Sequence, residues 1–194
     1  LSLSVSGLLS GKIGGPSVFP PMPPEVAALS YANSFKWKTS NGEDRHRRGM
    51  YTFFKRTAPH PNLIAFDCPD SNTTNVQRRR SNTPIQALTT LNNNVFTEAS
   101  QAFGSRILEL KASSDLERMQ QALRMCIARA PTDFETKRFL ELLEKARTHY
   151  REDPAGAAKL VGTHLPKGIP ATEAAPWVTV TRIILNLDEF ITRE

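Results

Sequence analysis

Prolines and glycines crowd the beginning of the chain, and they restrict its fold more than any other feature. Residues 11–24, GKIGGPSVFPPMPP, contain five prolines and three glycines. Proline lacks a backbone donor and fixes φ, so this stretch suits neither a central strand nor a helix interior. We expect residues 1–35 to be an extended, partly polyproline-like loop that lies across another surface. Its expected anchors are Ile13, Val18 and Phe19. EVAALSYANSF, residues 25–35, is also compatible with a short turn or helix, or with a strand end.

The next segment, residues 36–80, also lacks a helical repeat of apolar residues. MYTFFKRT is compatible with a short helix or strand, and NLIAFDCPD with a brief strand or an extended loop. The mixed-charge run EDRHRRG, residues 43–49, is typical of a solvated loop. Long irregular segments are uncommon in compact domains and are usually functional or part of a larger interface. We therefore expect residues 36–80 to contribute to the function.

A clear helix start follows this segment. Thr83 is a good N-cap, Pro84 suits the first helical position, and Gln86 completes a capping box. Apolar residues then recur at helical spacing: Ile85, Leu88, Leu91 and Val95. The asparagines at positions 92–94 are expected to end this helix, because asparagine favours turns.

Further helical patterns continue to the end of the chain. We expect helices over residues 95–111 and from about 116 to 130, the latter with a stripe of Leu116, Met119, Leu123 and Ile127. A second capping box, Thr132 with Glu135, predicts the next helix. Its apolar stripe is expected to begin at Phe134.

A Pro/Gly-rich connector follows, with one helical turn expected over residues 155–160, and Pro176 is expected in the first turn of the last helix. The sequence thus predicts a mainly α fold. A bundle of about five helices, residues 83–194, follows an irregular basic docking segment, residues 1–82. We expect one structural unit, excised from a larger protein, because the chain opens with Leu1 and lacks the basic flank of a signal peptide.

The positive charge is concentrated in one segment. Residues 36–80 contain ten Lys/Arg and four Asp/Glu, whereas the rest of the chain contains 25 − 10 = 15 basic and 19 − 4 = 15 acidic residues. The whole net charge of +6 therefore belongs to this segment. Such a segment favours an acidic surface or an anionic ligand as its partner.

Cysteine spacing argues against metal or covalent haem in this chain. Cys68 and Cys126 are far apart, and no CxxC, CxxCH or His-rich tract accompanies them. Two buried thiols are the favoured interpretation, and a disulfide stays open if the protein is exported. No apolar run reaches the roughly 18 residues typical of a transmembrane helix.

Several stretches, taken in order, resemble one family. The stretches that carry the resemblance are SGLLSGKIGGPSVFPP, RRGMYTFFKRTAPHPNLIAFDCPD, RRRSNTPIQALTTLNN, ARAPTDFE and TRIILNLDEFITRE. They resemble the C-terminal domain of unknown function of planctomycete cytochrome-c-associated multidomain proteins. The resemblance covers nearly the whole chain. The family often has a cysteine near residues 72–75, where this chain has Cys68 instead, which leaves a disulfide open. The resemblance implies an exported protein with covalent haem on an upstream module and none in this chain.

Five basic residues are candidates for anion binding: Lys55, Arg56, Arg78, Arg79 and Arg80. A helix N-terminus attracts anions, and arginines beside it match carboxylate, sulfate or phosphate. The favoured interpretation is structural pairing with Asp67, Asp70 or carboxylates of a neighbouring domain. An acidic-sugar site is the alternative, and nucleic-acid binding is weaker because no recognition helix accompanies the segment.

The loop that follows the aromatic run supplies three polar candidates. His60 lies between two prolines and could act as a general base, with Asp67 and Asp70 nearby in sequence. An exposed loop position is the favoured interpretation for His60. No G-x-S-x-G, HExxH or phosphate-binding loop occurs, so no catalytic residue is assigned.

The sequence therefore favours a non-catalytic interaction domain of an exported, cytochrome-associated protein, with the upstream domains of the same polypeptide as its partners. The alternative is an anionic-glycan-binding or polysaccharide-active component that uses the basic segment. Nucleic-acid binding is the weaker third hypothesis.

Overall fold

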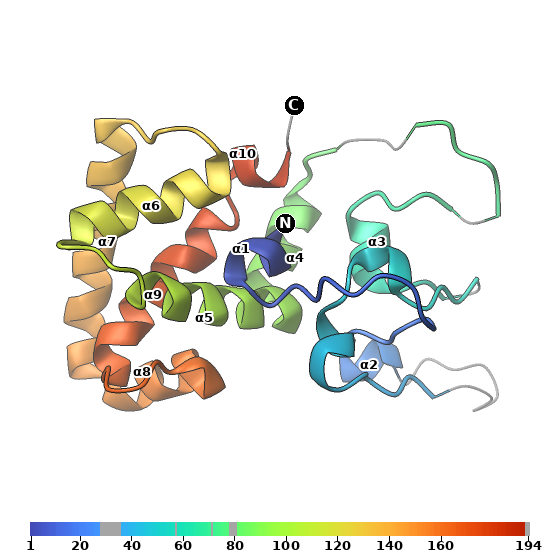
Figure 1. The fold of residues 1–194 in the computed structure, drawn as a ribbon, viewed down its shortest axis with the longest axis horizontal. Helices are drawn as coiled ribbons and strands as arrows, with labels where there is room; N and C mark the ends of the chain where they lie inside the picture. Colours follow the sequence, from blue (N-terminus) through green and yellow to red (C-terminus); the bar gives the residue numbers. More distant parts are fainter. Residues whose placement is uncertain (28–35, 57, 71, 78–80, 193–194) are drawn as a thin grey trace.

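The computed structural model describes residues 1–27, 36–56, 58–70, 72–77 and 81–192. The fold is mainly α-helical, as predicted, and the described residues form no extended strand beyond an isolated bridge between Val18 and Thr52. Figure 1 shows a helical bundle on one side and a smaller, loop-rich part on the other. We call this smaller part, the described residues from 10 to 77, the N-terminal lobe.

The bundle is organised around α5 (Asn94–Leu108) and α9 (Ala171–Ile184), which pack along each other. Around them lie α6 (Asp115–Ile127), α7 (Asp133–Glu152), α8 (Pro154–Val161) and the 3₁₀ turn η4 (Gly162–His164). The core is apolar and fully buried at its centre, with Phe103, Ile107, Met119, Leu123, Leu143, Trp177 and Ile184. Helix α8 is longer than the single helical turn that the sequence predicts over residues 155–160.

Side-chain caps start several helices. Thr83 caps α4 (Pro84–Asn92) and Thr132 caps α7, as predicted, and Ser114 caps α6. Asn93 ends α4 and its side chain accepts a hydrogen bond from Val95 N at 3.0 Å, so it also starts α5. The predicted break at the three asparagines is confirmed.

The last helix differs from its prediction. Pro176 lies inside α9, which already begins at Ala171, so this proline is in the second turn instead of the expected first turn. The chain then turns at residues 185–187 before the short helix α10 (Asp188–Ile191). The predicted single helix to the end of the chain is wrong.

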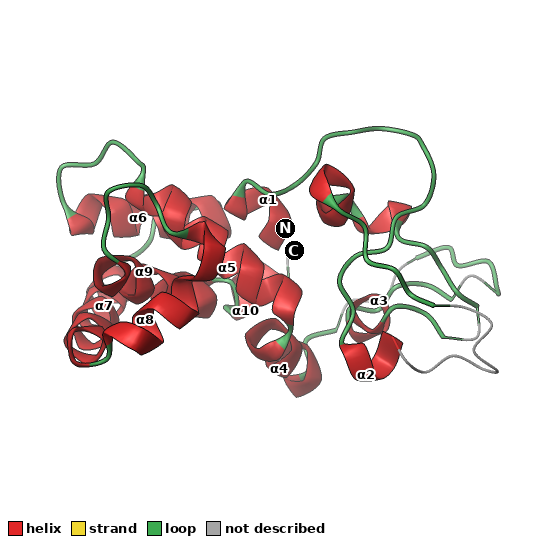
Figure 2. Ribbon diagram, turned by 90° about the horizontal axis from the view of Figure 1, so that it is seen from below, coloured by secondary structure: helices red, strands yellow, loops and turns green. Residues whose placement is uncertain are grey.

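Short helices occur in the segments that were expected to be irregular. α1 (Ser2–Ser6), which lies where loop was expected, packs on α5. The N-terminal lobe contains α2 (Pro24–Ala27), the 3₁₀ turns η2 (Gly42–His46) and η3 (Gly49–Tyr51), and α3 (Pro61–Ala65). The expectation of a strand or loop at NLIAFDCPD is wrong for residues 62–65, because His60 caps a helix there and Pro61 suits its first turn. Residues 66–70 form a turn and a loop. Figure 2 shows these short helices linked by long loops.

A small aromatic cluster holds the N-terminal lobe together. The ring of Phe19 lies 5.2 Å from Trp37 and 5.1 Å from Phe53, and the indole of Trp37 donates to Pro20 O at 2.8 Å. Of the expected anchors, Val18 is buried and Phe19 is half-buried. Ile13 is 81% exposed, so its predicted anchoring role is wrong.

Helix α4 exposes apolar side chains and buries polar ones. Ile85 and Leu88 are 68% and 58% exposed, whereas Gln86 and Thr90 are buried. The sequence periodicity correctly groups Ile85 with Leu88, and the structure turns this pair away from the core. Phe134 at the start of α7 is likewise exposed instead of beginning a core stripe.

Candidate functional site

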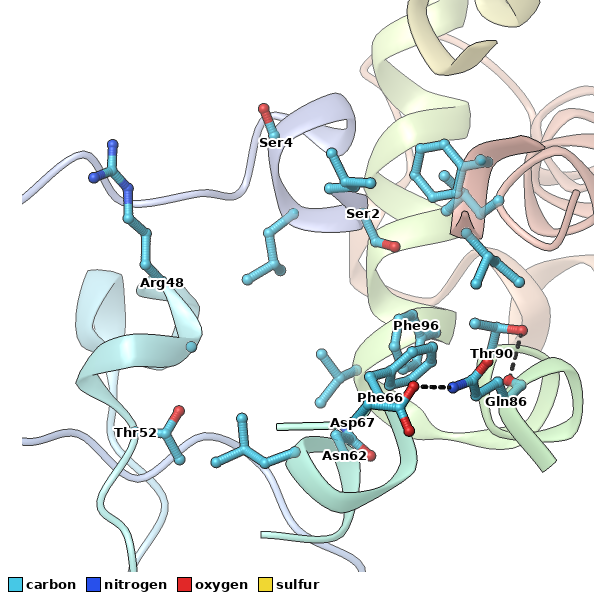
Figure 3. Close-up of a pocket in the computed structure, with 18 of the residues that line it drawn as sticks. Ser2, Ser4, Arg48, Thr52, Asn62, Phe66, Asp67, Gln86, Thr90 and Phe96 are labelled. Atoms are coloured by element: carbon cyan, nitrogen blue, oxygen red, sulfur yellow. Dashed lines mark hydrogen bonds between the residues drawn. The ribbon is translucent and has the colours of Figure 1, made fainter. Parts of the chain in front are cut away.

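A cavity lies where α1, α3, α4, α5 and α10 meet the N-terminal lobe. Its volume is about 670 Å³, and its lining extends from Leu1 to Thr192 along the chain. Most of the lining is apolar, with polar side chains gathered in a few places, as Figure 3 shows. This combination is typical of small-ligand pockets.

Asp67 anchors a polar network in one wall of the cavity. It follows α3 with a left-handed backbone (φ 55°), which is uncommon outside glycine. Its Oδ2 accepts a hydrogen bond from Ser81 Oγ at 2.6 Å and another from Gln86 Nε2 at 3.2 Å. Gln86 Nε2 also donates to Ser81 Oγ at 3.0 Å, so the three side chains fix one another. Figure 3 shows the hydrogen bond between Gln86 and Asp67.

Gln86 links this network to the start of α4. Its Oε1 accepts from Thr83 N at 3.1 Å, and its own backbone N–H donates to Thr83 Oγ1 at 3.3 Å. The capping box predicted from the sequence is therefore present. Gln86 is only 1% exposed, and its side-chain amide has two roles. Oε1 caps α4, and Nε2 orients the carboxylate of Asp67.

His60 lies in a structural position. Its side chain is buried, which contradicts the favoured expectation of an exposed loop residue. Nδ1 accepts from Asn62 N at 3.2 Å, so Nε2 carries the proton and donates to Pro21 O at 3.1 Å. Burial lowers the pKa of His60 and outweighs the opposing hydrogen bond to Pro21. The ring is thus a neutral helix cap with both nitrogens engaged.

Asp67 and Asp70 have separate partners. Both border a second hollow of about 390 Å³, together with Cys68. Asp70 is exposed, and its Oδ1 accepts from Asn72 N at 3.0 Å. The carboxylate of Asp67 is held instead by Ser81 and Gln86. Asp67 and Asp70 are therefore close in sequence, but their carboxylates have different hydrogen-bond partners.

The predicted anion-binding residues are only partly described. Arg78, Arg79 and Arg80 lie outside the described residues, Lys55 is half-buried and Arg56 is exposed. Neither Lys55 nor Arg56 lines the cavity of about 670 Å³. The arginines that do are Arg47 and Arg48, which the sequence interpretation assigned to a solvated loop.

Arg47 is buried without a counter-charge. It is 5% exposed, and its Nη2 donates to Lys12 O at 3.0 Å and Gly14 O at 2.7 Å. Its guanidinium carbon lies 3.7 Å from the ring centre of Tyr51. Nε and Nη1 have no hydrogen-bond partner in the described part of the chain, and no described carboxylate forms an ion pair with Arg47. Arg47 therefore ties the Gly-rich loop to η3 and leaves positive charge beside the cavity.

Two neighbours of Arg47 join the N-terminal lobe to the bundle. Arg45 Nη2 lies 3.0 Å from Glu98 Oε2 on α5, and His46 Nε2 lies 3.2 Å from Glu98 Oε1. Burial alone would raise the pKa of Glu98, but the hydrogen bonds and positive charges of Arg45 and His46 outweigh it and lower the pKa. Residues 43–49 are thus an anchored segment.

Within the described ranges, no three His, Cys, Asp or Glu side chains group in a way that could hold a metal ion. Cys68 and Cys126 are not joined by a disulfide; the first is half-buried and the second buried. Among the helices that the structure describes, none is long and apolar enough to cross a membrane.

The fold and the cavity define a class: a mainly helical domain with a largely apolar pocket beside a loop-rich lobe. A family model described as "PSD1: Protein of unknown function (DUF1553)" matches residues 1–143. The chain belongs to this family, which agrees with the predicted domain of unknown function. The match spans the N-terminal lobe and continues into α7. No curated protein and no solved structure matches the chain.

Proposed function

We propose that this chain is a non-catalytic interaction domain of an exported multidomain protein associated with a c-type cytochrome. Residues 1–82 serve as the basic docking segment and residues 83–194 as the supporting bundle. The partners are upstream domains of the same polypeptide, one of which carries covalent haem. Membership of a family of unknown function and the resemblance of the sequence support this proposal.

The outward face of α4, which directly follows the docking segment, extends the proposed docking surface and carries the argument for it. Ile85 and Leu88 lie three residues apart and are therefore neighbours on the helix surface. Both are exposed, although the same helix buries Gln86 and Thr90. Neighbouring apolar side chains turned outward in this way are a feature of surfaces that other protein elements cover.

The test mixes this chain with the separately expressed upstream domains and measures their affinity. The double substitution Ile85→Lys and Leu88→Lys should weaken binding by at least about tenfold, because it places charge in an apolar contact. Leu116→Lys, a comparable change on α6, serves as the control. Equal affinity of the α4 variant and the unaltered chain, both folded, would contradict the proposal.

A second candidate function rests on exposed cations. Lys36, Lys38 and Arg56 are exposed and form no ion pair with any residue that the structure describes. Together with Lys55 and the arginines at 78–80, they form our proposed site for an anionic polysaccharide. Salt-tolerant binding to one anionic glycan on an array would support it. Binding that falls steeply with salt and shows no sugar preference would indicate the weaker nucleic-acid alternative.

A further inference from the structure

We propose that the cavity of about 670 Å³ binds an apolar carboxylate, with its anionic head beside Arg47 and Arg48 and its aliphatic chain along the apolar lining. The proposal concerns a small ligand and is independent of docking through α4. It rests on the distribution of charge around the cavity and on the character of its walls.

The positive end of the cavity is formed by two consecutive arginines. Arg47 is buried, lines the cavity and has no carboxylate partner among the described residues. Arg48 also lines the cavity, is exposed, and pairs with no acidic residue in the described part of the chain. A buried cation without a counter-charge is unfavourable, so an anion close by would stabilise this end.

The opposite wall sets the direction of the ligand. Figure 3 shows Arg48 and Thr52 on one side of the cavity and Asp67 with Gln86 on the other. Asp67 already accepts hydrogen bonds from Ser81 and Gln86, and its negative charge would repel a second carboxylate. The head of the ligand therefore belongs at the arginine side.

The space between these walls suits a hydrocarbon chain. Its lining contains six large apolar side chains: Leu3, Leu9, Leu63, Phe66, Phe96 and Phe190. The rings of Phe66 and Phe96 lie 5.5 Å apart, so α3 and α5 contribute adjoining apolar surfaces. The volume falls within the range of roughly 300–1,000 Å³ usual for small-ligand pockets.

Calorimetric titration of the whole chain tests the charge preference with three ligands of equal chain length: decanoate, decanol and decylammonium, each below its micelle concentration. Decanoate should bind at least about tenfold more tightly than decylammonium, because the cations favour the anion. In the series octanoate, decanoate and dodecanoate, each added methylene should tighten binding by about fourfold. No decanoate binding, or equal binding of the three head groups, would overturn the proposal.

Two matched variants locate the head group. Arg48→Gln should weaken decanoate binding by about tenfold and leave decanol binding unchanged, because only the anion uses the charge. Arg56→Gln removes an exposed cation of the same lobe that does not line this cavity, and it should change neither. Equal losses in the two variants would show general electrostatic attraction and would contradict the assigned site. Since both arginines are exposed, both variants should fold, which a thermal melt checks.

Discussion

Thr83 shows how one hydroxyl serves both the fold and the cavity. Its Oγ1 accepts from Gln86 N, and the reciprocal bond brings Gln86 toward Asp67. Thr83→Ala should lower the free energy of unfolding by about 1 kcal/mol through loss of the cap. Thr89→Ala on the same helix, at an exposed-side hydroxyl bonded to Ile85 O, is the control and should cost little. A melting temperature unchanged by Thr83→Ala would contradict this role.

Gly104 allows the two central helices to approach each other. A Cβ at this position would lie 3.1 Å from the backbone nitrogen and from Cγ2 of Val178 on α9. Gly104→Ala should therefore destabilise the bundle by about 1–3 kcal/mol, as overpacking does, despite the better helix propensity of alanine. Denaturant unfolding measures the loss. Gly11→Ala, where a Cβ would meet nothing within 4 Å, should leave stability almost unchanged. Equal stability of the two variants would argue against the close helix contact.

At the scale of elements, Arg129 joins the start of α7 to α10. Its guanidinium donates to Glu135 at 2.6 and 3.0 Å and to Glu189 at 2.7 Å. Hydrogen bonds from Arg129, and then from the backbone of Thr132, lower the pKa of Glu135 to about 2. The hydrogen bond from Arg129 also lowers the pKa of Glu189.

These lowered pKa values predict a pH dependence of stability. The contribution of Glu135 is complete above its unfolded pKa of about 4.3 and is lost as pH falls toward 2. Glu135→Gln can still cap Thr132 but has no charge, so its melting temperature should fall less between pH 5 and pH 2 than that of the unaltered chain. High salt should reduce the difference, since the network is on the surface. Parallel melting curves at all pH values would exclude this contribution.

Most helices could be predicted from the sequence because their starts are encoded locally. Thr83, Ser114 and Thr132 lie within three residues of the groups they cap. Orientation could not be predicted in the same way. The repeat that includes Ile85 and Leu88 shows that they share a face of α4, but only the position of α4 on its neighbours decides whether that face meets the core.

The sequence gives little indication of the cavity. Asp67 stands out only as a carboxylate near His60 and Gln86 only as part of a capping box, whereas Arg47 belongs to a charged run that usually marks a solvated loop. Its burial depends on carbonyls of Lys12 and Gly14, more than thirty residues earlier in the chain. No spacing rule covers contacts of that separation, so tertiary structure alone reveals the site.

At the scale of the whole molecule, Glu98 is a main link between the N-terminal lobe and the bundle. Hydrogen bonds to charged groups contribute about 1.5–3 kcal/mol, so losing those from Arg45 and His46 should make local opening at least about tenfold more frequent. In Glu98→Ala, limited proteolysis should cleave the loops of the N-terminal lobe correspondingly faster while the bundle stays intact. Glu109→Ala, an exposed position just after α5, is the control. Unchanged cleavage rates would show that other contacts hold the lobe.

The lining of the cavity also has a consequence for biosynthesis. It combines Leu1 and Leu3 with Phe190 and Ile191, so its walls come from segments that are far apart in the sequence. During translation the helices of the bundle can form from local contacts, whereas this pocket closes only after α10 has left the ribosome. Contacts between such distant residues are slow to form. A nascent chain should therefore acquire the central helices of the bundle before this pocket forms.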